Sequence, residues 1–314
     1  MYLMSHGNAY GKVGGIYNQD GNIIIESLVQ TGPNTLYENK NPHIKYPEKI
    51  KISNYDIDET FVNNSCIFGK HFHLHYGHQL INVICSLHYL FDPKFENHVK
   101  IFNVSEKKSA VHLSWKRLKT ILGYHKDDVF FHMEPKLLKS NFTVAEETAN
   151  EILAGNDQAL ARFDVVRQRI RENIDCKLPI NAKHKKYFLE RDAFSLRLPI
   201  EVQDCIRKHL SSHGFIALKM RKFSFAEQIA IMNNATMVAG FSGSQLHNSM
   251  FCNKGTFVLN IGDKIRDFEN KAHNRVQQSI CDAHNNYHFI GTKNSDTEKV
   301  IQKIDIEIEK HKNE

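Results

Sequence analysis

One stretch of the chain whose composition suits ligand binding is a Gly/Ser-rich turn. It follows the apolar run 236–240 and contains Gly240, Ser242, Gly243, Ser244 and Asn248. Small residues let a backbone approach a ligand closely, and the N–H groups of a first helical turn attract an anion such as a diphosphate. A plain tight turn capped by Ser242 or Ser244 explains the same pattern. Neither the glycine pattern of dinucleotide-binding enzymes nor that of P-loop enzymes occurs, which argues against both classes.

Two arginines, Arg191 and Arg197, come just after a predicted strand at 187–190. The carboxyl ends of parallel strands border the binding crevice, and a planar guanidinium can pair with two phosphate oxygens at once. The pair therefore indicates a phosphate-binding position, although two solvated surface arginines would give the same sequence.

Histidines recur at His71, His73, His75 and His78. The first three alternate and would share one face of a strand, while His78 begins a predicted helix. A histidine suits general-base removal of a hydroxyl proton because it titrates near neutral pH. The alternating set is also compatible with a zinc site or with an ordinary polar strand face. The Asp56-Ile-Asp58 triplet has the form of a metal-binding Asp-x-Asp, but it lies outside a strand end and is interpreted as chance.

The second half of the chain alternates predicted strands and helices. The strands are expected at 187–190, 215–220, 236–240 and 256–261, and the helices at 199–211 and 224–234. Gly214 stands where a helix C-cap is expected, and Ser224 with Glu227 has the spacing of a capping box. This alternation predicts an α/β fold with a parallel, Rossmann-like sheet.

The first half is less regular. We expect two short strands around the turn 18–21, strands at 66–75 and 99–104, and helices at 78–91, 114–122 and 143–173. Thr143 and Glu146 have capping-box spacing, and Gly155 to Asp157 should interrupt the last of these helices. The domain junction is expected near 176–183, and an amphipathic helix over 296–312 near the end of the chain.

Composition narrows the possible partners. The net charge of +6 comes from 41 Lys+Arg and 35 Asp+Glu, a mixed surface without nucleic-acid-binding motifs. A modest positive excess suits phosphate-bearing small molecules or a weak attraction to anionic lipids. Six irregularly spaced cysteines predict reduced, mostly buried thiols. No secretory signal or membrane span is recognisable, so a soluble, cytoplasmic location is expected.

Taken in order, these motifs resemble those of the family 61 glycosyltransferases. The resemblance runs from Gly14-Gly-Ile-Tyr-Asn-Gln-Asp-Gly21 to about Asn260 and includes His78-Gln-Leu-Ile-Asn82, Arg191, Arg197, Glu227-Gln228, the turn 240–248, Phe251 and Gly255-Thr256. The chain departs from the family at four positions. Asn82 replaces an Asp, Ser242 a His, Gln245 a Gly, and Glu201 a frequent Asn.

The resemblance implies a GT-B-like fold, with two Rossmann-like domains facing across a cleft. Residues 1–176 would form the acceptor-side domain, and residues 177–314 the nucleotide-sugar-binding domain with its terminal helix. By analogy the donor would be held by Arg191, Arg197, Glu227, Ser242, Gly243, Ser244 and Asn248. His78, or failing that Glu201, would act as the catalytic base. No metal ligand or required cofactor is implied, and assistance by a divalent ion is left open.

The activity that the resemblance implies is inverting transfer of a sugar from a nucleotide-sugar donor to a glycan or lipid-linked glycan acceptor. The expected setting is synthesis of a bacterial surface polysaccharide, of capsular or lipopolysaccharide type. Peripheral attachment to the inner membrane face, or to a synthase complex, is compatible with the sequence. Two alternatives are a metal-dependent hydrolase using the His71, His73 and His75 face, and a non-catalytic subunit that binds a nucleotide sugar.

Overall fold

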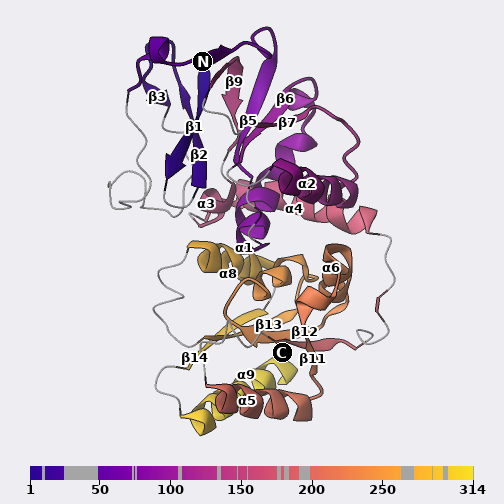
Figure 1. Ribbon diagram of the computed structural model, residues 1–314. Helices are drawn as coiled ribbons and strands as arrows, with labels where there is room; N and C mark the ends of the chain where they lie inside the picture. Colours follow the sequence, from indigo (N-terminus) through magenta and orange to yellow (C-terminus); the bar gives the residue numbers. More distant parts are fainter. Residues whose placement is uncertain are drawn as a thin grey trace. The chain divides into compact units, whose positions relative to one another are not determined.

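The structure, a computed structural model, divides into two compact units, Met1–Asn173 and Ile174–Glu314 (Figure 1). It describes residues 1–8, 11–24, 49–72, 74, 76–104, 108–132, 136–146, 148–153, 155–174, 178–179, 184–190, 199–262, 272–284, 286–292 and 296–313. Arg191, Arg197, His73 and His75 lie outside these residues. The chain has a mixed α/β architecture, as predicted.

The first unit opens with a mixed sheet whose described strands have the order β3-β2-β1-β8-β4. Its strands are β1 (Tyr2–Asn8), β2 (Gly11–Tyr17), β3 (Ile23–Ile24), β4 (Ile57–Asp58) and β8 (Leu137–Lys139). The turn between β2 and β3 is closed by Asn18 Oδ1, which accepts hydrogen bonds from the backbone N–H groups of Asp20 and Asn22, both at 2.9 Å. The predicted hairpin at 18–21 is therefore confirmed, whereas β1 was not expected.

The second sheet of this unit is parallel and has the order β7-β6-β5-β9 over the described strands. Its strands are β5 (Ser65–His71), β6 (Val99–Asn103), β7 (Val129–His132) and β9 (Asn141–Val144). One face packs against the first sheet through an apolar core that includes Leu3, Ile16, Phe68 and Ile101. Two layers of sheet thus share one core, where a Rossmann domain would place helices.

Helices cover the other face of the parallel sheet (Figure 1). They are α1 (Tyr76–His78), η3 (Gln79–Val83), η4 (Ile84–Leu90), α2 (Lys108–Leu122), α3 (Thr148–Leu153) and α4 (Asp157–Asn173), besides the short turns η2 (Ile52–Asn54) and η5 (Pro93–Phe95). Trp115 of α2 contacts the rings of Phe102 and Phe131, whose centroids lie 6.1 and 6.2 Å away. The expected helix 78–91 is present, but as a π-helical turn followed by a 3-10 segment.

The prediction that Thr143 caps a long helix is wrong. Thr143 lies in β9 and pairs with Ile67 of β5, and the helix begins only at Thr148. Sheet pairing overrides the local capping-box spacing here. The predicted interruption is confirmed, because α3 ends before Gly155 and Asn156 Oδ1 caps α4 by accepting from the Gln158 N–H at 2.9 Å.

The second unit contains a parallel sheet with the described strand order β11-β10-β12-β13-β14. The strands are β10 (Lys186–Leu189), β11 (Ile216–Leu218), β12 (Met237–Phe241), β13 (Phe257–Gly262) and β14 (Asn286–Gly291). Numbered along this unit, the order is 2-1-3-4-5, that of a doubly wound fold with an order reversal beside its first strand. The parallel sheet predicted for this half is confirmed.

Helices flank this sheet on both faces (Figure 1). They are α5 (Ile200–Ser212), η8 (Met220–Lys222), α6 (Phe225–Asn234), η9 (Leu246–Phe251), α8 (Ala272–His284) and α9 (Thr297–Asn313). Contacts join α5 to α9, and join η9 to α6 and α8. The capping box of Ser224 and Glu227 is confirmed, as is Gly214 with its φ of 82° after α5.

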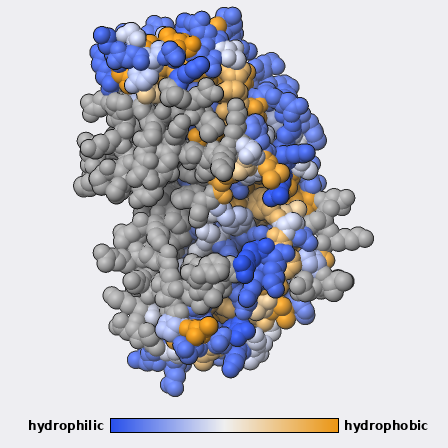
Figure 2. Space-filling model, in the orientation of Figure 1, coloured by the Kyte–Doolittle hydropathy of each residue, from blue (hydrophilic) through white to orange (hydrophobic). Residues whose placement is uncertain are grey.

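Hydrophilic and hydrophobic residues are interspersed over the described surface that Figure 2 shows. The cysteines within the described residues are thiols, of which Cys66, Cys85, Cys252 and Cys281 are buried and Cys205 is exposed. None of the described helices combines the length and apolar character that a bilayer span requires.

The packing of α9 generates a first prediction. Ile304 is fully buried in the core of the second unit, whereas Ile306 in the same helix is 53% exposed. Ile304→Ala should lower the free energy of unfolding by about 2–5 kcal/mol, because it leaves a cavity among close-packed side chains. Ile306→Ala is the matched control and should change it by less than about 0.5 kcal/mol. Urea denaturation measures both, and equal effects would contradict the described packing of α9.

Candidate functional site

The order reversal in the second sheet marks the first candidate site. β10 lies between β11 and β12, and the connections that leave β10 and β12 run in opposite directions across the sheet. In such sheets ligands bind beside the carboxyl ends of the strands at the reversal. Leu189 of β10 pairs in register with Gly240 of β12, so both strands end at the same edge. The turn after Phe241 therefore leaves the sheet beside the end of β10.

Ser242 anchors this turn to the sheet. Its backbone N–H donates to the Ile261 carbonyl at 2.9 Å, and its hydroxyl donates to Asn260 Oδ1 at 2.6 Å. The Asn260 side-chain amide in turn donates to the Tyr287 hydroxyl at 2.7 Å. Ser242 is 8% exposed and Asn260 1% exposed. Both donors of Ser242 thus hold the turn in place, and Ser242 offers no spare hydrogen to a phosphate.

Two backbone donors come next in the chain. The backbone N–H groups of Gly243 and Ser244 have no acceptor among the residues that the structure describes, and both residues are partly exposed. Gly243 has a φ of 153°, which side chains other than glycine's rarely allow. Gln245 Oε1 is a buried acceptor with no donor within the described part of the chain. Two backbone N–H donors without an acceptor among the described residues therefore lie in the predicted phosphate-binding turn.

Asn248 supports the turn from inside the protein. It is fully buried, and its side-chain amide donates to Gln228 Oε1 at 3.1 Å and to the Gln245 carbonyl at 3.0 Å. A second buried chain runs from His247 Nδ1 to Gln277 Oε1 at 2.8 Å and from the Gln277 amide to Ser249 Oγ at 3.0 Å. The supporting roles of Asn260 and Gln277 were not predicted. Neither residue belongs to a recognisable motif, because their hydrogen-bond partners lie on other strands and helices.

Glu227 and Glu201, the two glutamates predicted as site residues, lie at the starts of helices. Glu227 accepts from the Ser224 backbone N–H at 2.7 Å, and these hydrogen bonds hold the pKa of Glu227 below its ordinary value. Its carboxylate is thus used in capping α6. Glu201 is exposed in the first turn of α5, the helix that follows the segment 191–198.

The parallel sheet of the first unit reverses its order as well, between β5 and β9. His71 is the last residue of β5, and the Ala145 N–H beyond β9 donates to the Phe68 carbonyl at 2.9 Å. His78 ends α1 directly before the π-helical turn, a geometry common at functional sites. The side chains of His71 and His78 lie outside the described atoms. The histidine stretch therefore begins at the edge where a ligand is expected.

A pocket of about 500 Å³ lies beside this reversal. Its lining includes Ile67 of β5, the end of β9, and the side chains of Tyr89, Phe91, Phe95, Glu146 and Arg162. Arg162 pairs with Glu146 at 2.9 Å. Aromatic rings beside a charged pair offer stacking surfaces and directed hydrogen bonds to a polar ligand.

His88 also lines this pocket, and its pKa is lowered from 6.5 to about 4. Burial disfavours the charged imidazolium, and the positive charge of Arg162 adds to the effect. His88 is therefore neutral at pH 7.

The Asp-x-Asp triplet is not part of either site, because Asp58 Oδ1 accepts from the Thr60 N–H at 2.9 Å in a local turn.

The Ser242–Asn260–Tyr287 chain generates a prediction. Asn260→Ala removes the acceptor of Ser242 and the donor to Tyr287 inside a buried site, which should lower the free energy of unfolding by about 1–3 kcal/mol. Asn253→Ala removes an exposed hydrogen bond to the Asn233 carbonyl and should cost less than about 0.5 kcal/mol. Urea denaturation compares the two variants. A loss for Asn260→Ala no larger than the control would refute the anchoring role.

His88 predicts a pH dependence of stability. The pKa of His88 in the folded protein lies below its ordinary value, so the unfolded state takes up a proton first as the pH falls. The free energy of unfolding is therefore unaffected by His88 above pH 6.5 and decreases as the pH falls from 6.5 toward 4. Wild-type protein should lose about 2 kcal/mol more unfolding free energy between pH 7.5 and 5 than His88→Gln does. The exposed His125 supplies a control, since His125→Gln should keep the wild-type pH dependence. An unchanged pH dependence in His88→Gln would contradict the buried, neutral imidazole.

Comparison with known proteins agrees with the sequence motifs. A search of curated protein sequences found no match to the chain. The sequence pattern of the family described as Glycosyltransferase 61 matches residues 76–259, more than half of the chain. The match covers the histidine stretch from Tyr76 onward, the segment that holds both arginines, and the anchored turn. The chain therefore belongs to glycosyltransferase family 61, a family of enzymes that transfer glycosyl groups.

Proposed function

We propose that the enzyme is an inverting glycosyltransferase that moves a sugar from a nucleotide-sugar donor to a glycan or lipid-linked glycan acceptor. The observation that carries the donor assignment is the pair of Gly243 and Ser244 N–H groups at the order reversal of the second sheet. Backbone N–H groups in such a turn are suited to a diphosphate. The Asn260 and Asn248 hydrogen bonds support this proposal, because they hold the donors in place before a ligand arrives.

In the proposed site, Arg191 and Arg197, which follow β10 in the sequence, pair with the diphosphate oxygens. Ser242 and Asn248 act as positioning residues, since their side chains are hydrogen-bonded within the protein. Neutralisation by arginines and N–H groups makes a divalent ion unnecessary for this step, so turnover should not depend on added Mg²⁺.

The reaction proposed here is a single displacement. The acceptor hydroxyl loses its proton to His78, or to Glu201, as its oxygen attacks the anomeric carbon. The bond from that carbon to the donor phosphate oxygen breaks, which inverts the anomeric configuration. Negative charge grows on the leaving nucleoside diphosphate, where the arginines and the Gly243 and Ser244 N–H groups stabilise it.

We assign acceptor binding to the first unit. Its pocket presents Phe91 and Phe95 beside the Arg162–Glu146 pair, which suits a sugar face and its hydroxyls. The proposal includes the GT-B-like fold that the family resemblance implies. We place the reaction in bacterial surface polysaccharide synthesis, at the cytoplasmic side of the inner membrane, on analogy with the family.

Turnover by an arginine variant tests the proposal. Full-length protein is incubated with a panel of nucleotide sugars and glycan acceptors, and the transferred sugar and released nucleotide are quantified. Arg191→Ala should lower kcat about 10²–10³-fold while the melting temperature stays near wild type, because charge stabilisation in the transition state is lost. Arg117→Ala, which changes an exposed arginine in α2, is the control and should retain full activity. Wild-type turnover by Arg191→Ala would refute the assigned role, and donor binding without transfer to any acceptor would indicate a non-catalytic subunit.

A further inference from the structure

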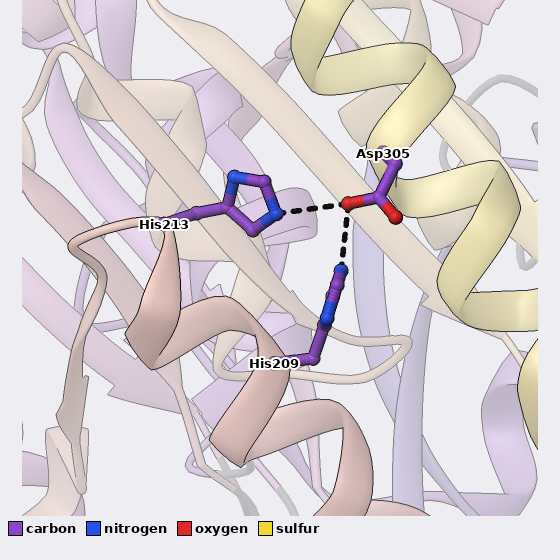
Figure 3. Close-up of side chains that lie close together, drawn as sticks. All are labelled: His209, His213 and Asp305. Atoms are coloured by element: carbon purple, nitrogen blue, oxygen red, sulfur yellow. Dashed lines mark hydrogen bonds and ion pairs between the residues drawn. The ribbon is translucent and has the colours of Figure 1, made fainter.

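A cluster of two histidines and one aspartate lies on the α5/α9 face of the second unit (Figure 3). His209 and His213 are one helical turn apart on α5, so their side chains project from the same face. Asp305 comes from α9, which packs against α5. Both imidazole Nε2 atoms approach the same carboxylate oxygen, at 2.7 Å from His209 and 2.8 Å from His213.

We propose that His209, His213 and Asp305 form a binding site for one divalent transition-metal ion with the ligand preference of Zn²⁺. Two imidazole nitrogens and one carboxylate oxygen are a ligand set that zinc accepts, with water in the fourth position. The proposal concerns a site outside the donor turn and does not depend on the proposed transferase mechanism.

The distances fit an ion after a small outward movement of the side chains. The three ligand atoms lie within 4.8 Å of one another. Tetrahedral coordination at about 2.0–2.1 Å from each atom requires ligand atoms about 3.3 Å apart. The observed N–O separations of 2.7 and 2.8 Å are therefore short by about 0.5 Å. Partly exposed side chains on two helices can open by this amount through small rotations about χ1 and χ2.

The surroundings of the cluster also favour a cation. His209 lies in the last turn of α5 and His213 is its C-cap, and the carbonyl end of a helix attracts positive charge. The side chains of both histidines are 21% exposed and that of Asp305 is 42% exposed, so solvent can supply an ion and the remaining water ligand.

A bound ion would fasten α9 to α5. The core side chains Val300, Ile304 and Ile308 already hold one face of α9 against the sheet. The cluster adds a polar connection at the surface edge of the same helix pair. Ion binding should therefore stabilise the folded state, and the stabilisation should grow with the logarithm of the free ion concentration once that concentration exceeds Kd. The competing interpretation is that two imidazole N–H groups simply share the Asp305 carboxylate, with no metal involved.

Metal titration of full-length protein separates these interpretations. Protein stripped with a chelator is titrated with Co²⁺, and its visible absorption reports tetrahedral coordination; Zn²⁺ is then added as a competitor. We expect binding of about one Co²⁺ per chain, displacement by Zn²⁺, and a rise in melting temperature with Zn²⁺. Absence of saturable binding would overturn the proposal.

Variants locate the ion. The double variant His209→Gln, His213→Gln should lose more than the roughly 10–100-fold in metal affinity that loss of a supporting residue costs. Asp305→Asn keeps an oxygen acceptor for the imidazoles but removes the charge, so it should weaken Zn²⁺ binding while the metal-free melting temperature changes little. His125→Gln removes an exposed histidine in the first unit and should bind normally. Far-UV circular dichroism checks that each variant is folded. Unchanged Co²⁺ binding in the folded double variant would place the ion elsewhere and overturn the proposal.

Discussion

The hydrogen bond from Ser242 Oγ to Asn260 Oδ1, 2.6 Å long and buried between two strands, determines where the chain goes after β12. It is continued by Tyr287 on β14, so three neighbouring strands hold one turn. Because Ser242 is fixed, the backbone leaves the sheet edge at a defined position, and this places the N–H groups of Gly243 and Ser244. The account of donor binding depends on this constraint, because unanchored N–H groups would have to be ordered at the expense of binding energy.

Both units place their candidate site beside a reversal of strand order. Each contains a parallel sheet that reverses its strand order, and in each the family-typical residues follow the strand at the reversal. His71 ends β5 in the first unit, and Glu190 precedes the two arginines after β10 in the second. The sheets provide rigid edges, and we propose that the loops that follow them bind the ligands. The neutral His88 and the Arg162–Glu146 pair give the first unit a pocket of a different character from the phosphate-type turn of the second.

The sequence allowed the elements of the second unit from β10 to β13, and α9, to be predicted from local signals, whereas α8 and β14 were not expected. Ser224 and Glu227 form the capping box that predicts α6, and β12 and β13 are apolar apart from Asn260. Thr143 misled because the same capping spacing occurs inside a strand, where pairing with Ile67 decides the conformation. The position of the turn was predictable from the sequence. That the Ser242 and Asn248 side chains form hydrogen bonds within the protein was not predictable. Their partners Asn260 and Gln228 are distant in sequence, and no spacing rule connects them.

Hydrogen–deuterium exchange of the full-length protein, with and without a saturating nucleoside diphosphate, tests the central claim most directly. The nucleotide would be chosen as the one that most raises the melting temperature. The account predicts slower exchange in peptides covering 243–245 and 191–198, with peptides around His88 unchanged. Protection confined to the first unit, or no nucleotide-dependent protection at the turn after β12, would contradict the assignment of the donor diphosphate to the second unit.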